Sequence, residues 1–76
     1  MNWWERCSFE AFRDKFVREA EQNRAPEIRL GQEIANRTYL YFKENLTDWR
    51  PQKDCFYLDE NIGGYLREVY EIVRLG

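Results

Sequence analysis

Residues 26–46, PEIRLGQEIANRTYLYFKENL, decide the fold of this chain. Pro26 disfavours helical geometry at the residue before it and has no backbone donor, which predicts a break over residues 23–28 and a new helix soon after. At about 100° per residue, residues 30–46 then form one helix with a broad apolar side. That side comprises Leu30, Ile34, Ala35, Thr38, Tyr41, Phe42, Asn45 and Leu46.

The second half of this helix carries four consecutive large side chains, Tyr39-Leu40-Tyr41-Phe42. A surface helix normally has one apolar stripe, so four adjacent bulky residues extend beyond it. Tyr41 and Phe42 are expected in the core. Leu40 falls among the polar residues of the opposite side and Tyr39 at their edge, so this pair is expected to stay exposed.

Two further helices flank this segment. The first is expected from about Ser8 to Asn23, with Ser8 as its N-cap and aromatic residues three or four positions apart. Asn2 and Glu5 have capping-box spacing, which leaves open whether residues 2–7 form a separate turn or continue into the helix. Asp59 is expected to cap the last helix. The apolar repeat of that helix is Ile62, Leu66, Val69 and Val73.

The connection over residues 47–58 is too short and mixed for a confident strand, and its Trp49, Phe56 and Tyr57 are expected to fold back over the helices. Glycine costs about 1 kcal/mol relative to alanine within a helix. The pair Gly63-Gly64 therefore indicates close approach by another backbone, or a late start of the last helix near Gly64, and Gly31 indicates such an approach as well. Residues 1–76 are expected to form one compact, mostly α domain of three helices, with the aromatic-rich connection packed on them.

Charge and cysteine usage narrow the functional classes. The chain has 12 basic and 14 acidic residues, balanced in residues 1–25 and 26–58, so the acidic excess lies in residues 59–76. This distribution has no basic face of the kind that binds duplex nucleic acid. Cys7 and Cys55 lack metal-ligand spacing and are expected to be reduced thiols. No signal-peptide pattern or membrane-length apolar run is present, so we expect a soluble cytoplasmic protein.

Catalysis is disfavoured because the sequence contains no histidine, and hence no Ser-His or Cys-His pair. Carboxylate pairs such as Asp59 with Glu60, or Glu68 with Glu71, are more typical of a solvated helix face than of acid–base chemistry. Cys55 fits a small core residue better than a nucleophile. We therefore expect no enzyme activity, no cofactor and no metal.

Several residues together resemble a known group of proteins. Arg29-Leu30-Gly31-Gln32, then Asn36, then the segment DCFYLD of residues 54–59, resemble short uncharacterised proteins of tailed bacteriophages and prophages. Cys55 departs from the proline common at that position. The resemblance implies a phage accessory protein in the bacterial host cell and supplies no catalytic residue. In physical terms, Asn36 is expected to hold the Phe56-Tyr57 segment through its amide.

Binding to a host or phage protein is the favoured function, as a host-takeover or counter-defence inhibitor. Interfaces are enriched in Trp, Tyr and Arg. Self-association through the same patch would have the same sequence signature. The alternative is an adaptor that binds single-stranded nucleic acid or RNA, because Trp49-Arg50 and Arg37-Thr38-Tyr39 pair aromatics with arginine, although balanced charge argues against it. The predicted partner-binding residues are Trp3, Trp4, Arg37, Tyr39, Leu40 and Lys43.

Overall fold

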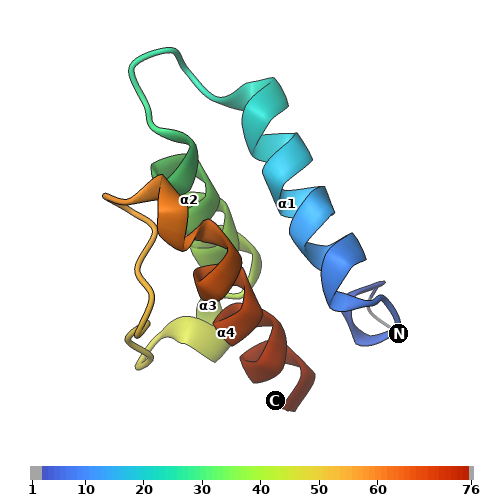
Figure 1. Ribbon diagram of the computed structural model, residues 1–76. Helices are drawn as coiled ribbons and strands as arrows, with labels where there is room; N and C mark the ends of the chain where they lie inside the picture. The colour runs from blue at the N-terminus through green and yellow to red at the C-terminus, as the bar shows by residue number, and fades with distance from the viewer. Residues whose placement is uncertain (1–2, 76) are drawn as a thin grey trace.

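The computed structural model describes residues 3–75, which are mostly helical and contain no strand (Figure 1). The mostly α prediction is confirmed, but the described residues form four α-helices where three were expected. In chain order the elements are the 3-10 helix η1 (Trp3–Glu5), α1 (Phe9–Asn23), α2 (Leu30–Tyr41), α3 (Lys43–Leu46), the 3-10 helix η2 (Asp59–Asn61) and α4 (Ile62–Leu75).

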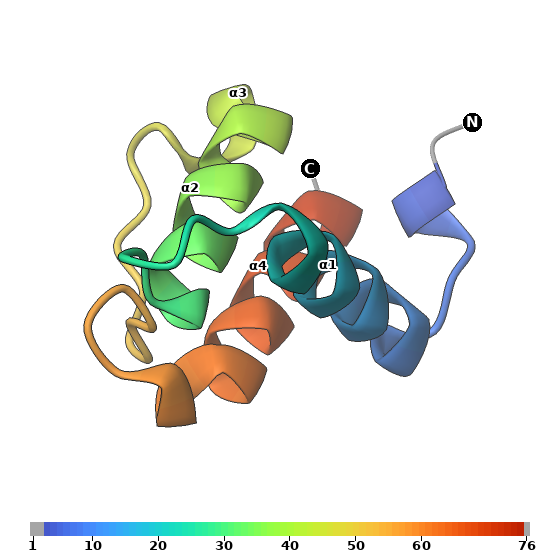
Figure 2. The same cartoon turned by 90° about the horizontal axis from the view of Figure 1, so that it is seen from above.

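The three long helices α1, α2 and α4 pack against one another around one core. Helix α1 covers one side of the α2–α4 pair, and the connection over residues 47–58 covers the other, as Figure 2 shows. The expected arrangement of a loop packed on the helices is therefore present, with Trp49 and Phe56 partly buried against the core. Tyr57, expected in the same role, is instead 69% exposed.

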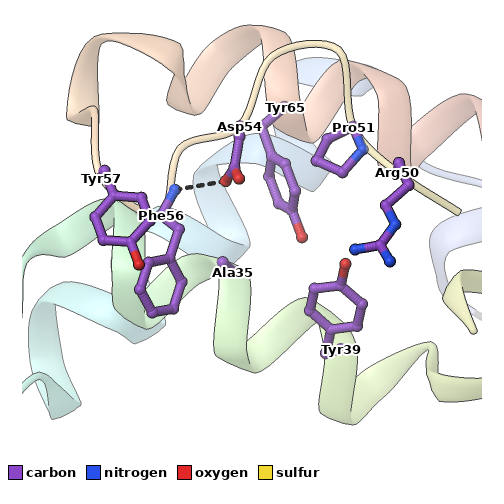
Figure 3. Close-up of a pocket in the computed structure, with 8 residues that line it drawn as sticks. All are labelled: Ala35, Tyr39, Arg50, Pro51, Asp54, Phe56, Tyr57 and Tyr65. Atoms are coloured by element: carbon purple, nitrogen blue, oxygen red, sulfur yellow. Dashed lines mark hydrogen bonds between the residues drawn. The ribbon is translucent and has the colours of Figure 1, made fainter.

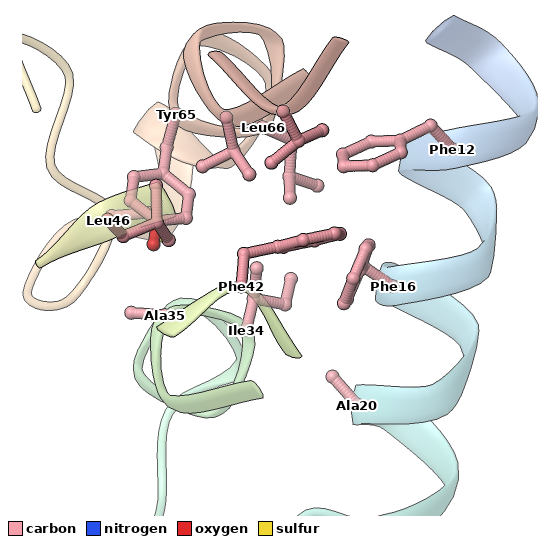
Figure 4. Packing of buried hydrophobic residues seen from close by; sticks show 12 residues of the cluster. Phe12, Phe16, Ala20, Ile34, Ala35, Phe42, Leu46, Tyr65 and Leu66 are labelled. Carbon is pink, nitrogen blue, oxygen red and sulfur yellow. The ribbon is translucent and has the colours of Figure 1, made fainter. Parts of the chain in front are cut away.

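The core is built from aromatic side chains of α1 and apolar side chains of α2 and α4 (Figure 4). The Phe12 and Phe16 rings lie 5.1 Å apart, and Phe42 stacks on Phe12 at 6.1 Å. Each fully buried side chain of this size contributes about 1.5–3 kcal/mol relative to exposure. Large aromatic residues thus give a 76-residue chain a continuous core.

A single polar pair lies inside this core among the described residues. The Thr38 hydroxyl donates to the Ala35 carbonyl at 2.9 Å, so the Tyr65 hydroxyl can donate to Thr38 Oγ1. Both side chains are fully buried. Burial raises the pKa of Tyr65, which keeps the phenol neutral as a donor.

The helix predicted to run unbroken through residue 46 is interrupted at Phe42, whose φ of −123° and ψ of 39° are not helical. Phe42, at the break, is buried as expected, with its ring 5.0 Å from that of Trp4, and Leu46 after the break is buried as well. The prediction that Tyr41 is a core residue is wrong, because it is 46% exposed and lies edge-on to Phe16 at the core margin. Asn45, placed on the same side by the uninterrupted helix, is also exposed.

Residues Trp3–Glu5 form a separate 3-10 turn rather than an extension of α1. Ser8 caps α1 as predicted, with its Oγ accepting from the Ala11 amide at 3.2 Å. The capping-box residue Asn2 lies outside the described residues. The turn and the residues after it contact the C-terminal half of α4, where Arg74 donates to the Glu5 carbonyl at 3.3 Å and the Tyr70 hydroxyl donates to the Cys7 carbonyl at 2.9 Å.

Asp59 caps a different helix from the one predicted. Its Oδ1 accepts from the Gly31 amide at 2.9 Å, so it satisfies an orphan donor in the first turn of α2, whose own N-cap side chain makes no such bond. The predicted close approach at Gly31 is confirmed, since a Cβ there would lie 2.0 Å from the Cys55 carbonyl oxygen. The prediction for Gly63-Gly64 is wrong, because a Cβ at Gly64 would meet the Lys53 side chain rather than a backbone, and α4 begins at Ile62. Nothing in the structure explains Gly63, where a Cβ would meet nothing within 4 Å.

Among residues 3–75, no helix combines the length and the apolar character that crossing a bilayer would require.

Candidate functional site

Carboxylates and amides hold the connection over residues 47–58 against α4. Glu68 accepts from the backbone amides of Gln52 and Lys53 at 3.0 and 2.7 Å. Asp54 Oδ1 accepts from the Phe56 amide at 2.8 Å, and Asn61 donates to the Asp54 carbonyl at 3.0 Å. These contacts fix which loop side chains face α2.

Asn36 does not perform the anchoring role that was predicted for it. Its side chain is exposed and makes no hydrogen bond to the Phe56-Tyr57 segment. The nearest equivalent contact comes from Arg29, whose Nη2 donates to the Phe56 carbonyl at 3.5 Å. The loop is instead positioned by carboxylates and by Asn61, which lie nearer to it in the fold.

A pocket of about 380 Å³ lies between this loop and α2 (Figure 3). We call it the Tyr39–Arg50 pocket. Three aromatic rings of α2 and the loop form its walls, and Arg50 and Tyr39 point toward one another at one end. Asp54 lies on the side of Phe56, to whose amide it is bonded. The lining residues are Ala35, Tyr39, Arg50, Pro51, Asp54, Phe56, Tyr57 and Tyr65.

A second, more open depression of about 740 Å³ lies on the other side of Tyr39, over α2 and α3. We call it the Leu40 groove. Tyr39 lines both hollows, so the two are adjacent. The residues lining the groove are Asn36, Tyr39, Leu40, Lys43, Leu46 and Thr47.

Three of the six predicted partner-binding residues therefore come together. Leu40 is 82% exposed, and Tyr39 beside it is 42% exposed. Lys43 lines the same groove and makes no ion pair with any residue that the structure describes. The expectation that Leu40 and Tyr39 cannot join the core is confirmed.

The other three predicted residues serve the fold in this structure. Arg37 pairs with Glu33 at 2.7 Å and with Glu19 at 3.8 Å, so it links α2 to α1. Trp3 is half-buried, with its ring 5.7 Å from that of Phe12. Trp4, also half-buried, packs edge-on to the Phe42 ring. These three side chains do not line the Leu40 groove.

Sequence reasoning missed the loop half of the Tyr39–Arg50 pocket. Arg50 was noted only as a neighbour of Trp49, and Asp54 only as part of the resemblance. From the sequence alone, the adjacent loop residues Trp49 and Arg50 do not indicate which of the two side chains faces α2. That orientation follows from the hydrogen bonds of Glu68, which is 18 positions further along the chain than Arg50, so no local pattern encodes it.

Cys55 and Glu71, two of the groups considered as candidate reactive residues, are buried or paired with other residues of the fold. Both cysteines are free, and burial raises the pKa of the Cys55 thiol to about 12, which suppresses its reactive thiolate. This thiol donates to the Gly31 carbonyl at 3.3 Å.

Glu71 pairs with Arg67 at 3.1 Å. Within residues 3–75, no three or more His, Cys, Asp or Glu side chains cluster as a metal site would require.

Comparison of the chain with models of protein families, with curated proteins and with solved structures finds no match.

Proposed function

We propose that this chain is a small non-catalytic protein that binds another protein through the Leu40 groove. The observation that carries the proposal is the 82% exposure of Leu40 in the last turn of α2, a helix whose opposite face is packed in the core. Ile34, Ala35 and Thr38 already fill the core side of α2, so Leu40 has no packing role inside the molecule.

The surroundings of Leu40 support a contact surface rather than an isolated exposed side chain. Tyr39, its neighbour in sequence and in the Leu40 groove, is also exposed. Tyrosine combines a large apolar ring with a hydroxyl, and it is enriched among residues that dominate binding energy. Lys43 at the groove can meet an acidic group at the rim of a partner. Contiguous apolar surface of this kind is typical of interaction sites.

The setting that the sequence resemblance suggests is a bacteriophage or prophage, with the partner a host or phage protein in the bacterial cytoplasm. Occlusion of that partner's working surface would make the chain an inhibitor, including one that counters a defence system. Such occlusion needs only shape and apolar contact, so it is compatible with a chain that has no histidine.

The test uses Leu40→Ser with Leu58→Ser as a matched control. Leu58 is 51% exposed and lies outside the Leu40 groove, so both variants remove one exposed leucine. Each should change the free energy of unfolding by less than about 1 kcal/mol, as for other exposed positions. Tagged wild type, both variants and a nuclease-treated sample are used to capture proteins from host lysate, and captured proteins are identified by mass spectrometry.

We expect a protein that wild type and Leu58→Ser retain and Leu40→Ser loses, with no effect of nuclease. Sedimentation of the purified chain distinguishes a self-dimer, which Leu40→Ser would dissociate. Equal retention by all three proteins, or retention that nuclease abolishes, would refute the proposal. A large loss of stability in Leu40→Ser would show that Leu40 belongs to the core.

A further inference from the structure

The Tyr39–Arg50 pocket holds two hydrogen-bond donors that the fold does not use. Neither the Arg50 guanidinium nor the Tyr39 hydroxyl has a hydrogen-bond or ion-pair partner among residues 3–75. Figure 3 shows both groups pointing toward one another at one end of the pocket. Guanidinium groups present a planar set of donors that matches the two oxygens of a carboxylate.

The rest of the pocket is suited to an apolar group. Ala35 and the rings of Phe56 and Tyr65 line it, and its volume of about 380 Å³ is near the lower end for ligand pockets, which span roughly 300–1,000 Å³. This space fits one ring or branched side chain better than a nucleotide. We propose that the pocket binds a carboxylate attached to an aromatic or branched aliphatic group.

Asp54 decides the orientation of this ligand. Its Oδ1 already accepts from the Phe56 amide, so it lies fixed on the Phe56 side of the pocket. A second carboxylate there would be repelled, whereas one at the opposite end meets Arg50 and the Tyr39 hydroxyl. A cationic ligand would have to bind at Asp54, where one carboxylate oxygen already accepts from the Phe56 amide. It would also leave the Arg50 guanidinium without a partner. The donors therefore select an anion, and Asp54 directs it away from Phe56.

Two sources can supply such a group: a free small acid, or the C-terminal residue of a polypeptide. Phenylacetate represents the first and N-acetylphenylalanine the second, and the corresponding amides have the same shape without the charge. Each of the four compounds is titrated into the isotope-labelled full chain, and amide chemical shifts are followed by NMR. The shifts are expected at Ala35 and Phe56, which lie against the apolar part of the ligand.

Three variants accompany the wild type. Arg50→Gln removes the guanidinium, and Arg18→Gln is its matched control, because Arg18 is an exposed arginine of α1 outside this pocket. Asp54→Asn keeps an oxygen to accept from the Phe56 amide but removes the negative charge. A spectrum of each free variant checks that its fold is unchanged.

In wild type and Arg18→Gln, the acids are expected to bind about tenfold more tightly than the amides, the factor that one charge-assisted hydrogen bond typically supplies. Arg50→Gln should abolish this preference, and Asp54→Asn should strengthen binding of the acids. Tighter binding of N-acetylphenylalanine than phenylacetate would assign the site to a polypeptide end, and the reverse order to a free acid. Either order supports the carboxylate site.

The proposal is overturned if acids and amides bind equally, if neither binds, or if Arg50→Gln keeps the preference for the acid. Weaker acid binding by Asp54→Asn would overturn the assigned orientation. These measurements do not involve Leu40, so failure of the carboxylate site and failure of the docking groove are separate results.

Discussion

Replacing Gly31 by alanine should destabilise the protein more than a single added methyl group suggests. The added Cβ would lie 2.0 Å from the Cys55 carbonyl oxygen and 2.8 Å from Asp59 Oδ1. Ordinary contact requires at least 3.4 Å, so the backbone at Cys55 must retreat by more than 1 Å. That movement strains the two hydrogen bonds joining Gly31 to the loop, from its amide to Asp59 and from the Cys55 thiol to its carbonyl.

The magnitude follows from three contributions. Overpacking against a backbone atom costs about 1–3 kcal/mol, and each weakened hydrogen bond costs about 0.5–1.5 kcal/mol. Alanine regains about 1 kcal/mol through its higher helix propensity. We expect a net loss of about 1–5 kcal/mol, which lowers the Tm of a domain of this size by roughly 4–40 °C.

Gly63→Ala is the matched control, because its Cβ would meet nothing within 4 Å. Only the propensity effect acts there, so this variant should be more stable than wild type by up to about 1 kcal/mol. Both are measured by urea unfolding followed by circular dichroism. A Gly31→Ala protein within about 0.5 kcal/mol of wild type, or equal losses in the two variants, would refute the reasoning.

Two further predictions concern the buried thiol and the loop anchor. Burial raises the pKa of Cys55 from 9.0 to about 12, so above pH 9 the unfolded chain loses a proton that the folded chain keeps. The free energy of unfolding should therefore fall between about pH 9 and 12, by up to about 1.4 kcal/mol per pH unit from this group. Cys55→Ala should flatten the decline measured by urea unfolding, and an unchanged slope would contradict the assignment. Glu68→Gln, which keeps one acceptor for the amides of Gln52 and Lys53, should cost about 1–3 kcal/mol and speed hydrogen exchange at both. Glu71→Gln, at an exposed pair, should change stability by less than about 1 kcal/mol, and similar effects of the two variants would argue against the anchor.

The segment of residues 54–59 has a structural role in this fold. Asp54 organises the loop turn, Cys55 packs against Gly31, and Asp59 caps α2. The segment and the Gly31 region therefore depend on one another for their conformation. These contacts join the two regions into one structural unit.

Local signals in the sequence determined much of the helical framework. The serine cap and apolar spacing predict α1 to within a residue, and the repeat beginning at Ile62 predicts α4. The same periodicity places Leu40 outside the core, as observed. Caps and periodicity act between residues a few positions apart, so the chain itself carries that information.

Tertiary structure alone decided the break at Phe42, the helix that Asp59 caps, and the meeting of Tyr39 with Arg50. Phe42 departs from helical geometry where its ring packs against Phe12 of α1, and Asp59 reaches a donor 28 positions earlier in the chain. These outcomes depend on which segments fold against each other in space. The spacing of side chains along one helix does not determine these contacts, because the residues that meet lie on different elements.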